Sequence, residues 1–183
     1  MALIATQLPE NFAEEIAKNA GVLVKNFNTE GWAVSRADII GATSGGINFK
    51  DAPEFTDFGE DIDNCPKNTM ELKEITDRAI TCGGTFVSAN MDLVKRLIGA
   101  GSISGKTITP SDELTEEDFG KLWLIVDYGK DNAVAIEMDN VLSTGGFAIQ
   151  TTDKNKGQFA FEFTAHYSLE NPDEVPYKVH FKE

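Results

Sequence analysis

The stretch from Leu142 to Tyr167 restricts the fold more than any other part of the sequence, because its pattern is that of a long β-hairpin. Phe147 and Ile149 alternate with smaller or polar residues, and a turn-like segment at 153–157 ends in glycine. After this turn every second residue is apolar: Phe159, Phe161, Phe163, Ala165 and Tyr167. A period of two with so many aromatic side chains predicts a strand that packs on a deep apolar surface.

Other strand patterns are shorter but follow one another along the whole chain. They fall at residues 22–24, 122–126, 134–138 and 177–181. Apolar residues at 32–49 are interrupted by glycines, which predicts a strand with a bulge or bend. Residues 70–81 and 85–87 predict a second hairpin, with its turn at Cys82-Gly83-Gly84.

Helical patterns are few. Residues 91–98 carry an apolar stripe that begins after Ser88 or Asn90 and ends at Gly99 or Gly101, and Pro9–Ala20 predicts a short second helix. Thr115 is followed three residues later by an acid, which predicts one capped turn. We therefore expect a mainly β (α+β) fold, an antiparallel β-sandwich or barrel with one flanking α-helix.

The composition fits one domain over residues 1–183. Cys65 and Cys82 are the only cysteines and belong to no metal-binding motif, so we expect two free thiols. No signal peptide and no membrane-length apolar run is visible, so we expect a soluble protein made in the cytoplasm. The net charge of −14 disfavours binding to a phosphate backbone, which needs a cluster of basic residues.

The acids are unevenly distributed. One acidic segment lies at 112–118, and a longer one has no base from Asp51 to Asn64. Residues 51–68 show no strand or helix period, so we expect a long loop there, and long ordered loops tend to be functional.

No motif points to catalysis, a metal ion or a cofactor. The glycine-containing segment 99–104 lacks the third glycine of a dinucleotide fingerprint, and the acids that begin at Asp61 lack the glycine and glutamate of a calcium loop. His166 and His180 are the only candidate bases at neutral pH, and neither has a nucleophile motif beside it. We therefore expect a protein that is not an enzyme and that binds no cofactor.

A series of local motifs, taken in order, resembles a known family. They are Asn19-Ala20-Gly21-Val22-Leu23-Val24, Ile40-Gly41-Ala42-Thr43-Ser44-Gly45-Gly46-Ile47, the acidic segment 57–64, Thr109-Pro110, Asp118-Phe119, Leu122-Trp123, Ser143-Thr144-Gly145-Gly146-Phe147, the turn at 153–157 and His166-Tyr167-Ser168-Leu169. Together they resemble the major tail tube proteins of long-tailed bacteriophages, especially those that infect Gram-positive hosts. None of the motifs is specific alone, but their order spans nearly the whole chain.

The resemblance implies a virion protein that assembles into hexameric rings. The rings stack into a hollow tail tube, and genomic DNA leaves the virion through it. The implied partners are further copies of the chain and other tail proteins such as the tape measure, tail tip and terminator proteins, with no specific nucleic-acid binding and no membrane. The chain would be made in the host cytoplasm and located in the tail.

Two sets of residues are candidates for roles in such a tube. In the expected loop, Phe55 and Phe58 could anchor a contact between stacked rings, surrounded by a rim of acids. The rim consists of Asp57, Glu60, Asp61 and Asp63. Because a basic bore would retain DNA, we expect a net acidic lumen, with Glu71 and Glu74 as candidates on opposite faces of an expected 70–81 strand. Lys73 would share a face with Glu71.

The sequence is also compatible with other classes of function. A monomeric β-sandwich could bind carbohydrate on Trp32, Trp123 or Tyr128, although Trp123 lies in the most apolar strand pattern. An acidic mimic of nucleic acid would form a discrete complex with a basic protein. The tube of a contractile tail or a secretion system would share the physics of a phage tail tube.

Overall fold

The computed structural model describes residues 19–129, 131–151, 153 and 155–182. Its strands are β1 Val22–Val24, β2 Thr43–Asp57, β3 Lys73–Phe86, β4 Gly101–Ser104, β5 Thr107–Pro110, β6 Gly120–Gly129, β7 Asn132–Ser143, β8 Phe159–Ala165 and β9 Tyr177–Phe181. The helix α2 spans Met91–Ile98, and short 3-10 turns lie at Met70–Leu72 and Glu116–Asp118. A curled antiparallel sheet, with one α-helix among the described residues, confirms the expected fold class.

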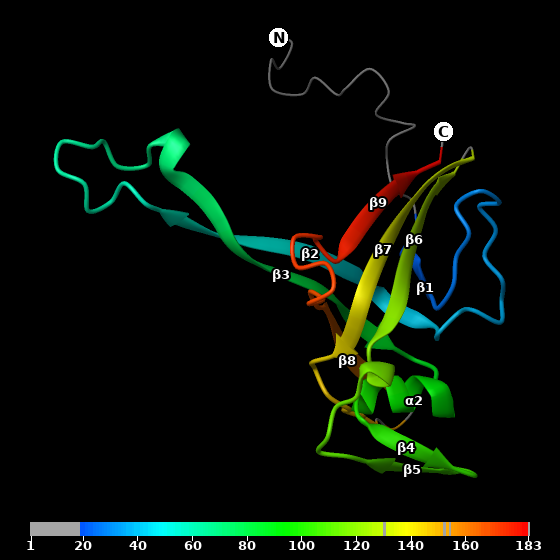
Figure 1. Cartoon of the computed structure of the whole chain (residues 1–183). Helices are drawn as coiled ribbons and strands as arrows, with labels where there is room; N and C mark the ends of the chain where they lie inside the picture. Colours follow the sequence, from blue (N-terminus) through cyan, green and yellow to red (C-terminus); the bar gives the residue numbers. More distant parts are fainter. Residues whose placement is uncertain (1–18, 130, 152, 154, 183) are drawn as a thin grey trace.

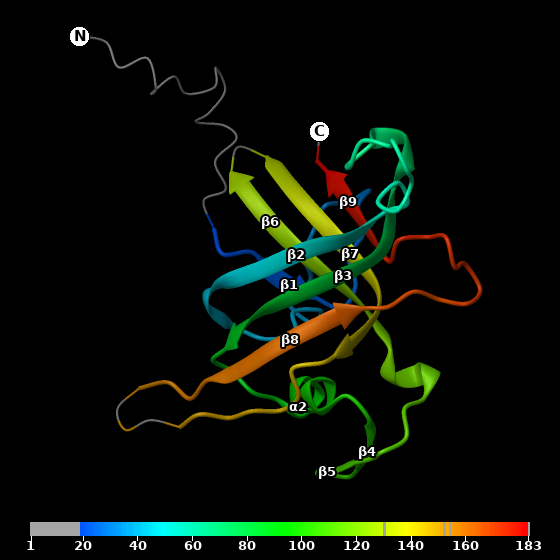
Figure 2. The ribbon, with the colours of Figure 1, turned by 90° about the vertical axis from the view of Figure 1, so that its left-hand side faces the viewer.

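One sheet contains all the strands except β4 and β5. Its order is β1-β6-β7-β8-β3-β2, and β9 also pairs with β7. Along one edge of β7, β9 pairs with residues 134–138 and β8 with residues 141–143. The sheet curls (Figure 1), and β2 and β3 cross in front of β6 and β7 in the view of Figure 2.

The core lies inside this curl. Its buried members include Leu23, Phe86, Leu122, Met138 and the aromatic residues of β8. Phe159, Phe161, Phe163 and Ala165 are buried while Ala160 and Glu162 are exposed, which confirms the predicted alternation over β8. The expectation that Tyr167 continues this buried face is wrong, because the strand ends at Ala165 and Tyr167 is 42% exposed. A smaller cluster around Trp123 lies on the opposite face of β1, β6 and β7.

Helix α2 closes one end of the core, and its ends are those that the sequence predicts. The Asn90 side chain accepts a hydrogen bond from the Leu93 backbone amide at 2.8 Å, and Gly99 adopts φ 81° after the last turn. Leu93 and Leu97 are fully buried. The Thr115 capping box is also present.

Several sequence-based expectations are wrong. The strand expected over residues 32–49 begins only at Thr43, because residues 32–42 form turns and loops. Residues 51–57 continue β2, so the expected loop at 51–68 is shorter. β3 runs through Cys82-Gly83-Gly84 without a turn, and Glu71 lies in a 3-10 turn. The stretch around Phe147 and Ile149 forms no extended strand and makes only an isolated bridge between Gln150 and Gln158. The expected helix at Pro9–Ala20 lies almost wholly outside the described residues.

Candidate functional site

The most conspicuous feature of the molecule is a projection, residues 51–79, which we call the arm. It consists of the distal parts of β2 and β3 and the segment that joins them, and it extends away from the rest of the chain (Figure 1). β3 pairs with β8 only from Ile80 onward, so the strands of the arm pair only with each other. A two-stranded ribbon without further support is marginally stable in water, so other interactions must maintain this one.

Two sets of hydrogen bonds maintain the arm. At its tip the Asp57 carboxylate accepts from the backbone amides of Gly59 at 2.9 Å and Asn68 at 2.8 Å. These two hydrogen bonds lower the pKa of Asp57, and the bond from Gly59 has the larger effect. The Phe58 amide donates a hydrogen bond to the Leu72 carbonyl at 2.9 Å, and this bond joins the two ends of the tip segment.

At the base of the arm, Asp51 joins the ribbon to β9. Its Oδ2 atom contacts the Arg78 guanidinium and accepts a hydrogen bond from the Tyr177 hydroxyl at 2.9 Å. This hydrogen bond raises the pKa of Tyr177. The Tyr177 ring lies 5.3 Å from the ring of Phe49 between centroids, so polar and aromatic contacts together fix the direction in which the arm leaves the body.

The arm exposes apolar side chains to solvent. Phe55 and Phe58 are 55% and 56% exposed, and Ile62, Met70 and Ile75 are exposed as well. The arm therefore carries five of the fifteen large exposed hydrophobic side chains of the described residues. Phe55 and Ile75 are cross-strand partners, and the Lys73 ammonium lies 5.3 Å from the Phe55 ring centroid. Several exposed apolar side chains on one projection are typical of an interaction site.

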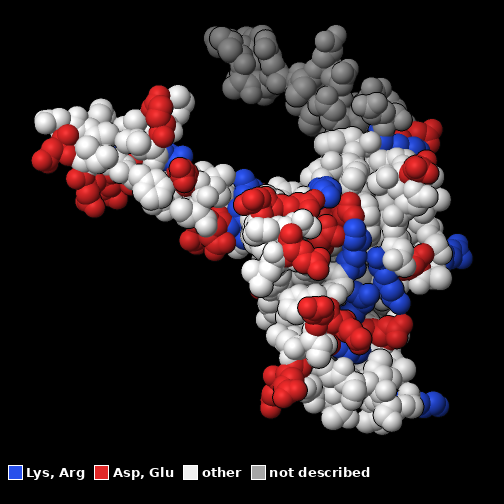
Figure 3. Space-filling model, viewed as in Figure 1, with Lys and Arg blue, Asp and Glu red and all other residues white. Residues whose placement is uncertain are grey.

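The arm is also strongly acidic. Residues 51–79 contain nine acids and three bases. Acidic side chains follow the arm to its tip (Figure 3). Apolar anchors among charged residues are the arrangement of a protein-protein interface with a polar rim.

The structure places both sets of sequence-predicted candidates on this one projection. Phe55 and Asp57 lie in β2, and Phe58, Glu60, Asp61 and Asp63 follow in the tip. Glu74 lies in β3, but Glu71 lies in the 3-10 turn, so the expectation that Glu71 and Glu74 occupy opposite faces of one strand is wrong. The expectation that Lys73 and Glu71 share one face of a strand is wrong for the same reason.

Sequence reasoning missed several residues of the arm. Ile62, Met70 and Ile75 are exposed apolar residues among charged neighbours, and a strand or helix period does not identify such residues. The contact of Asp51 with Arg78 and Tyr177 joins residues up to 126 positions apart, and no local pattern signals it.

The two histidines have local structural partners. His166 Nδ1 lies 3.1 Å from the Asn140 carbonyl, and its ring packs edge-on against Phe119. His180 Nε2 lies 3.0 Å from Glu137 Oε2, and its ring lies beside Trp123. Across the described residues, no group of three His, Cys, Asp or Glu side chains could hold a metal ion.

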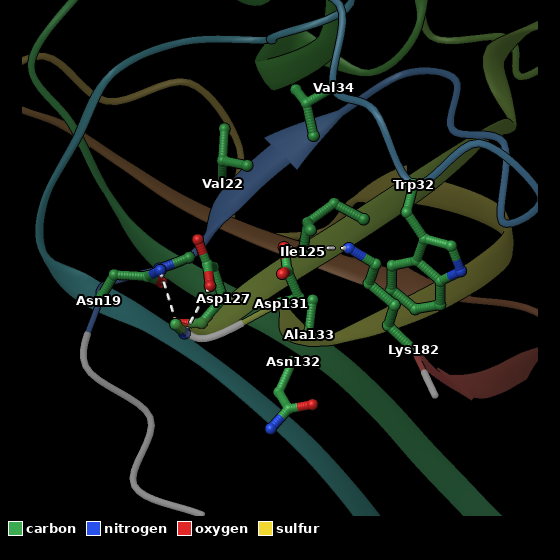
Figure 4. Close-up of a pocket in the computed structure, with 12 residues that line it drawn as sticks. Asn19, Val22, Trp32, Val34, Ile125, Asp127, Asp131, Asn132, Ala133 and Lys182 are labelled. Atoms are coloured by element: carbon green, nitrogen blue, oxygen red, sulfur yellow. Dashed lines mark hydrogen bonds and ion pairs between the residues drawn. The ribbon is translucent and has the colours of Figure 1, made fainter. Parts of the chain in front are cut away.

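A cavity of about 610 Å³ lies between the segment before β1, the loop that contains Trp32, and the ends of β6 and β7. Trp32, Val34 and Ile125 contribute its apolar surface, and Lys182 and Asp131 lie near one another beside it (Figure 4). Trp123 is buried in the core beneath Phe27, so of the two tryptophans only Trp32 lines this cavity.

No protein-family model matches the sequence, and no curated protein is significantly similar to it. No helix in the described part of the chain has the length and apolar character needed to cross a bilayer. The assignment of a function must therefore depend on the surfaces described above.

Proposed function

We propose that this protein is a structural subunit that self-assembles through its arm, and that it builds the hollow tail tube of a long-tailed bacteriophage. The observation that carries the proposal is the arm itself, a ribbon held by hydrogen bonds at base and tip that presents five large apolar side chains to solvent. A soluble monomer gains nothing from such a projection, whereas an interface would bury it.

Two open strand edges support the same proposal. Among the described strands, β9 pairs only with β7 and β2 pairs only with β3. Free edges invite pairing with other chains, and a closed ring of subunits removes them. In the proposed tube, six copies form each ring, their strands form one continuous inner barrel, and rings stack head to tail.

The charge of the chain suits the passage of DNA. Duplex DNA carries about one negative charge per 1.7 Å of its axis, and a basic lumen would retain it through counterion release. We propose a net acidic lumen, to which Glu71 and Glu74 contribute from the arm. The DNA passes through without specific binding, and the tape measure, tail tip and terminator proteins are the proposed partners at the tube ends. The subunit would be made in the host cytoplasm and located in the virion tail.

The test is negative-stain electron microscopy of concentrated protein together with light scattering across a dilution series. We expect hollow filaments or six-fold rings. A wild-type chain that stays monomeric at every concentration, including in the presence of purified tail tips as nuclei, contradicts self-assembly. Tubes enclosed by a contractile sheath in intact virions would instead assign the chain to a contractile tail, and tubes in a secretion apparatus would assign it there.

The cavity beside Trp32 supports a second candidate, a carbohydrate-binding module. A partly exposed tryptophan with polar neighbours is a suitable platform for a sugar ring. Such a module would remain monomeric, and a binding oligosaccharide would raise its melting temperature. A Trp32→Ala variant would abolish that shift.

A further inference from the structure

One face of the main sheet stays open to solvent, because the core lies only behind it. In β3, Ile80, Cys82 and Phe86 are buried in the core, and the residues that alternate with them lie on the opposite side of the strand. The pairing of β3 with β2 and β8 continues this opposite side across three strands. We call it the open face. It consists of every second residue of β2 from Asn48 to Glu54, of β3 from Asp77 to Thr85 and of β8 from Ala160 to Thr164.

The open face lacks the side chains that anchor contacts between proteins. Its residues form rows across the strands, such as Lys50 with Thr81 and Thr164, and each of them is half-buried or exposed. None of the fifteen large exposed hydrophobic side chains of the described residues lies on it. Stable contacts between proteins are usually anchored by buried aromatic or other large side chains. We therefore expect this face to remain in contact with water when subunits assemble.

The position of the core decides which way the open face points in a tube. β2 is an edge strand, since among the described strands it pairs only with β3, and in the proposed tube this edge is closed by a neighbouring copy. The wall of the resulting barrel has one side toward the axis and the other side outward.

The bulk of each subunit lies on one side of that wall. β6 and β7 lie behind β2 and β3 in the view of Figure 2, and helix α2 packs on the same core through Leu93 and Leu97. A bore that six copies enclose has no room for six cores, so the side that carries the core must point outward. The open face then points toward the axis.

We propose that the open face lines the bore of the tube. This inference rests on the proposed function and names the strands past which the DNA moves. The acids of the face are Glu54, Asp77 and Glu162, and its one base is Lys50, so each copy presents an excess of two negative charges.

The chemistry of the open face suits a wall along which a polyanion slides. Its other residues are alanine, threonine, glycine and asparagine, with no cluster of basic side chains to bind phosphates and no aromatic ring on which a base could stack. The excess of acids repels the phosphates weakly from every side. Such a wall neither binds nor retains the DNA.

The accessibility of single cysteines in assembled tubes tests the inference. In a Cys65→Ser background, Thr81→Cys and Glu162→Cys each place one thiol on the open face, on two different strands. N-ethylmaleimide is small enough to diffuse along a bore that admits DNA, whereas a maleimide on a bulky polyethylene glycol chain is excluded from it. We expect both reagents to modify dilute, unassembled protein. In tubes, N-ethylmaleimide should still modify both variants, and modification by the bulky reagent should be lost.

The Cys65→Ser parent is the matched control, because its remaining thiol, Cys82, is buried and should react with neither reagent. Glu162 is exposed, so Glu162→Cys carries the test if Thr81→Cys disturbs the sheet. Tubes that react with both reagents would place the open face on the outside, and tubes that react with neither would bury it between copies. Either result overturns this inference and leaves self-assembly intact, whereas a wild-type chain that never assembles overturns the proposed function as well.

Discussion

The double substitution Phe55→Ser and Phe58→Ser should greatly raise the concentration that assembly requires while leaving the fold intact. The two side chains are 55% and 56% exposed in the isolated chain. A phenylalanine buries roughly 150–250 Å² when fully covered, so docking removes about 100 Å² more from each. At about 25 cal/mol per Å², the pair contributes about 5 kcal/mol to a fully buried contact. Since each 1.4 kcal/mol is tenfold, the upper bound is between about three and four orders of magnitude in affinity.

Light scattering and electron microscopy across a dilution series measure this effect. Thermal unfolding provides the check on the fold, and we expect a change in stability below about 0.5 kcal/mol, because both positions are exposed. Ile103→Ser with Leu114→Ser is the matched control, since these side chains are 43% and 55% exposed but lie outside the arm. Normal assembly by the arm variant would refute the role of Phe55 and Phe58 as anchors.

Three further predictions concern the isolated chain. Tyr177→Phe removes the hydroxyl that donates to Asp51 and should lower the free energy of unfolding in urea by about 1 kcal/mol; an unchanged midpoint would argue against this contact as a stabilising one. The lowered pKa of Asp57 means that its hydrogen bonds stabilise the tip above the unfolded value of 3.8, and this stabilisation is lost as the pH falls through the folded value. Amide exchange of the tip should therefore accelerate in acid, and Asp57→Asn should remove that dependence; a tip protected equally at all pH values contradicts the reasoning. Burial raises the pKa of Cys82 to about 12, so a thiol reagent should modify only Cys65 in native protein and both thiols in denaturant; two reactive native thiols would show that the core opens.

The sequence predicts those elements whose faces differ in burial. Phe161 and its alternating neighbours lie in a strand with one buried face, and Leu93 and Leu97 lie on the buried stripe of a helix with identifiable caps. In each case the apolar residues recur along the sequence at the same spacing as the side chains that contact the core. The strand and helix assignments at these positions are therefore confirmed.

The arm could not be predicted in this way because it has no core. Pro53 and Phe55 lie in a strand that has no fully buried residue on either side, so no alternation marks it, and the stretch has the composition of a loop. The error at Gly83 and Gly84 has a different cause. A Cβ at Gly84 would lie 3.0 Å from the Gly46 carbonyl oxygen and from the Phe161 ring, so this glycine permits close packing inside a strand instead of a turn.

The contacts between Asp51, Arg78 and Tyr177, and the exposure of Phe181, depend on how distant strands meet. The candidate residues Phe55 and Phe58 were found because aromatic residues among acids stand out in the sequence.

The acidity of the arm disfavours some non-productive contacts of its apolar side chains. With nine acids and three bases, two arms that approach tip to tip repel each other, so a symmetric arm-to-arm dimer is disfavoured. Such a dimer could not grow further through the arms, because it would use both projections. At high ionic strength, where the Debye length shrinks to about 3 Å at 1 M salt, this protection disappears. Low salt therefore favours directional growth, and concentrated salt favours paired, inactive subunits.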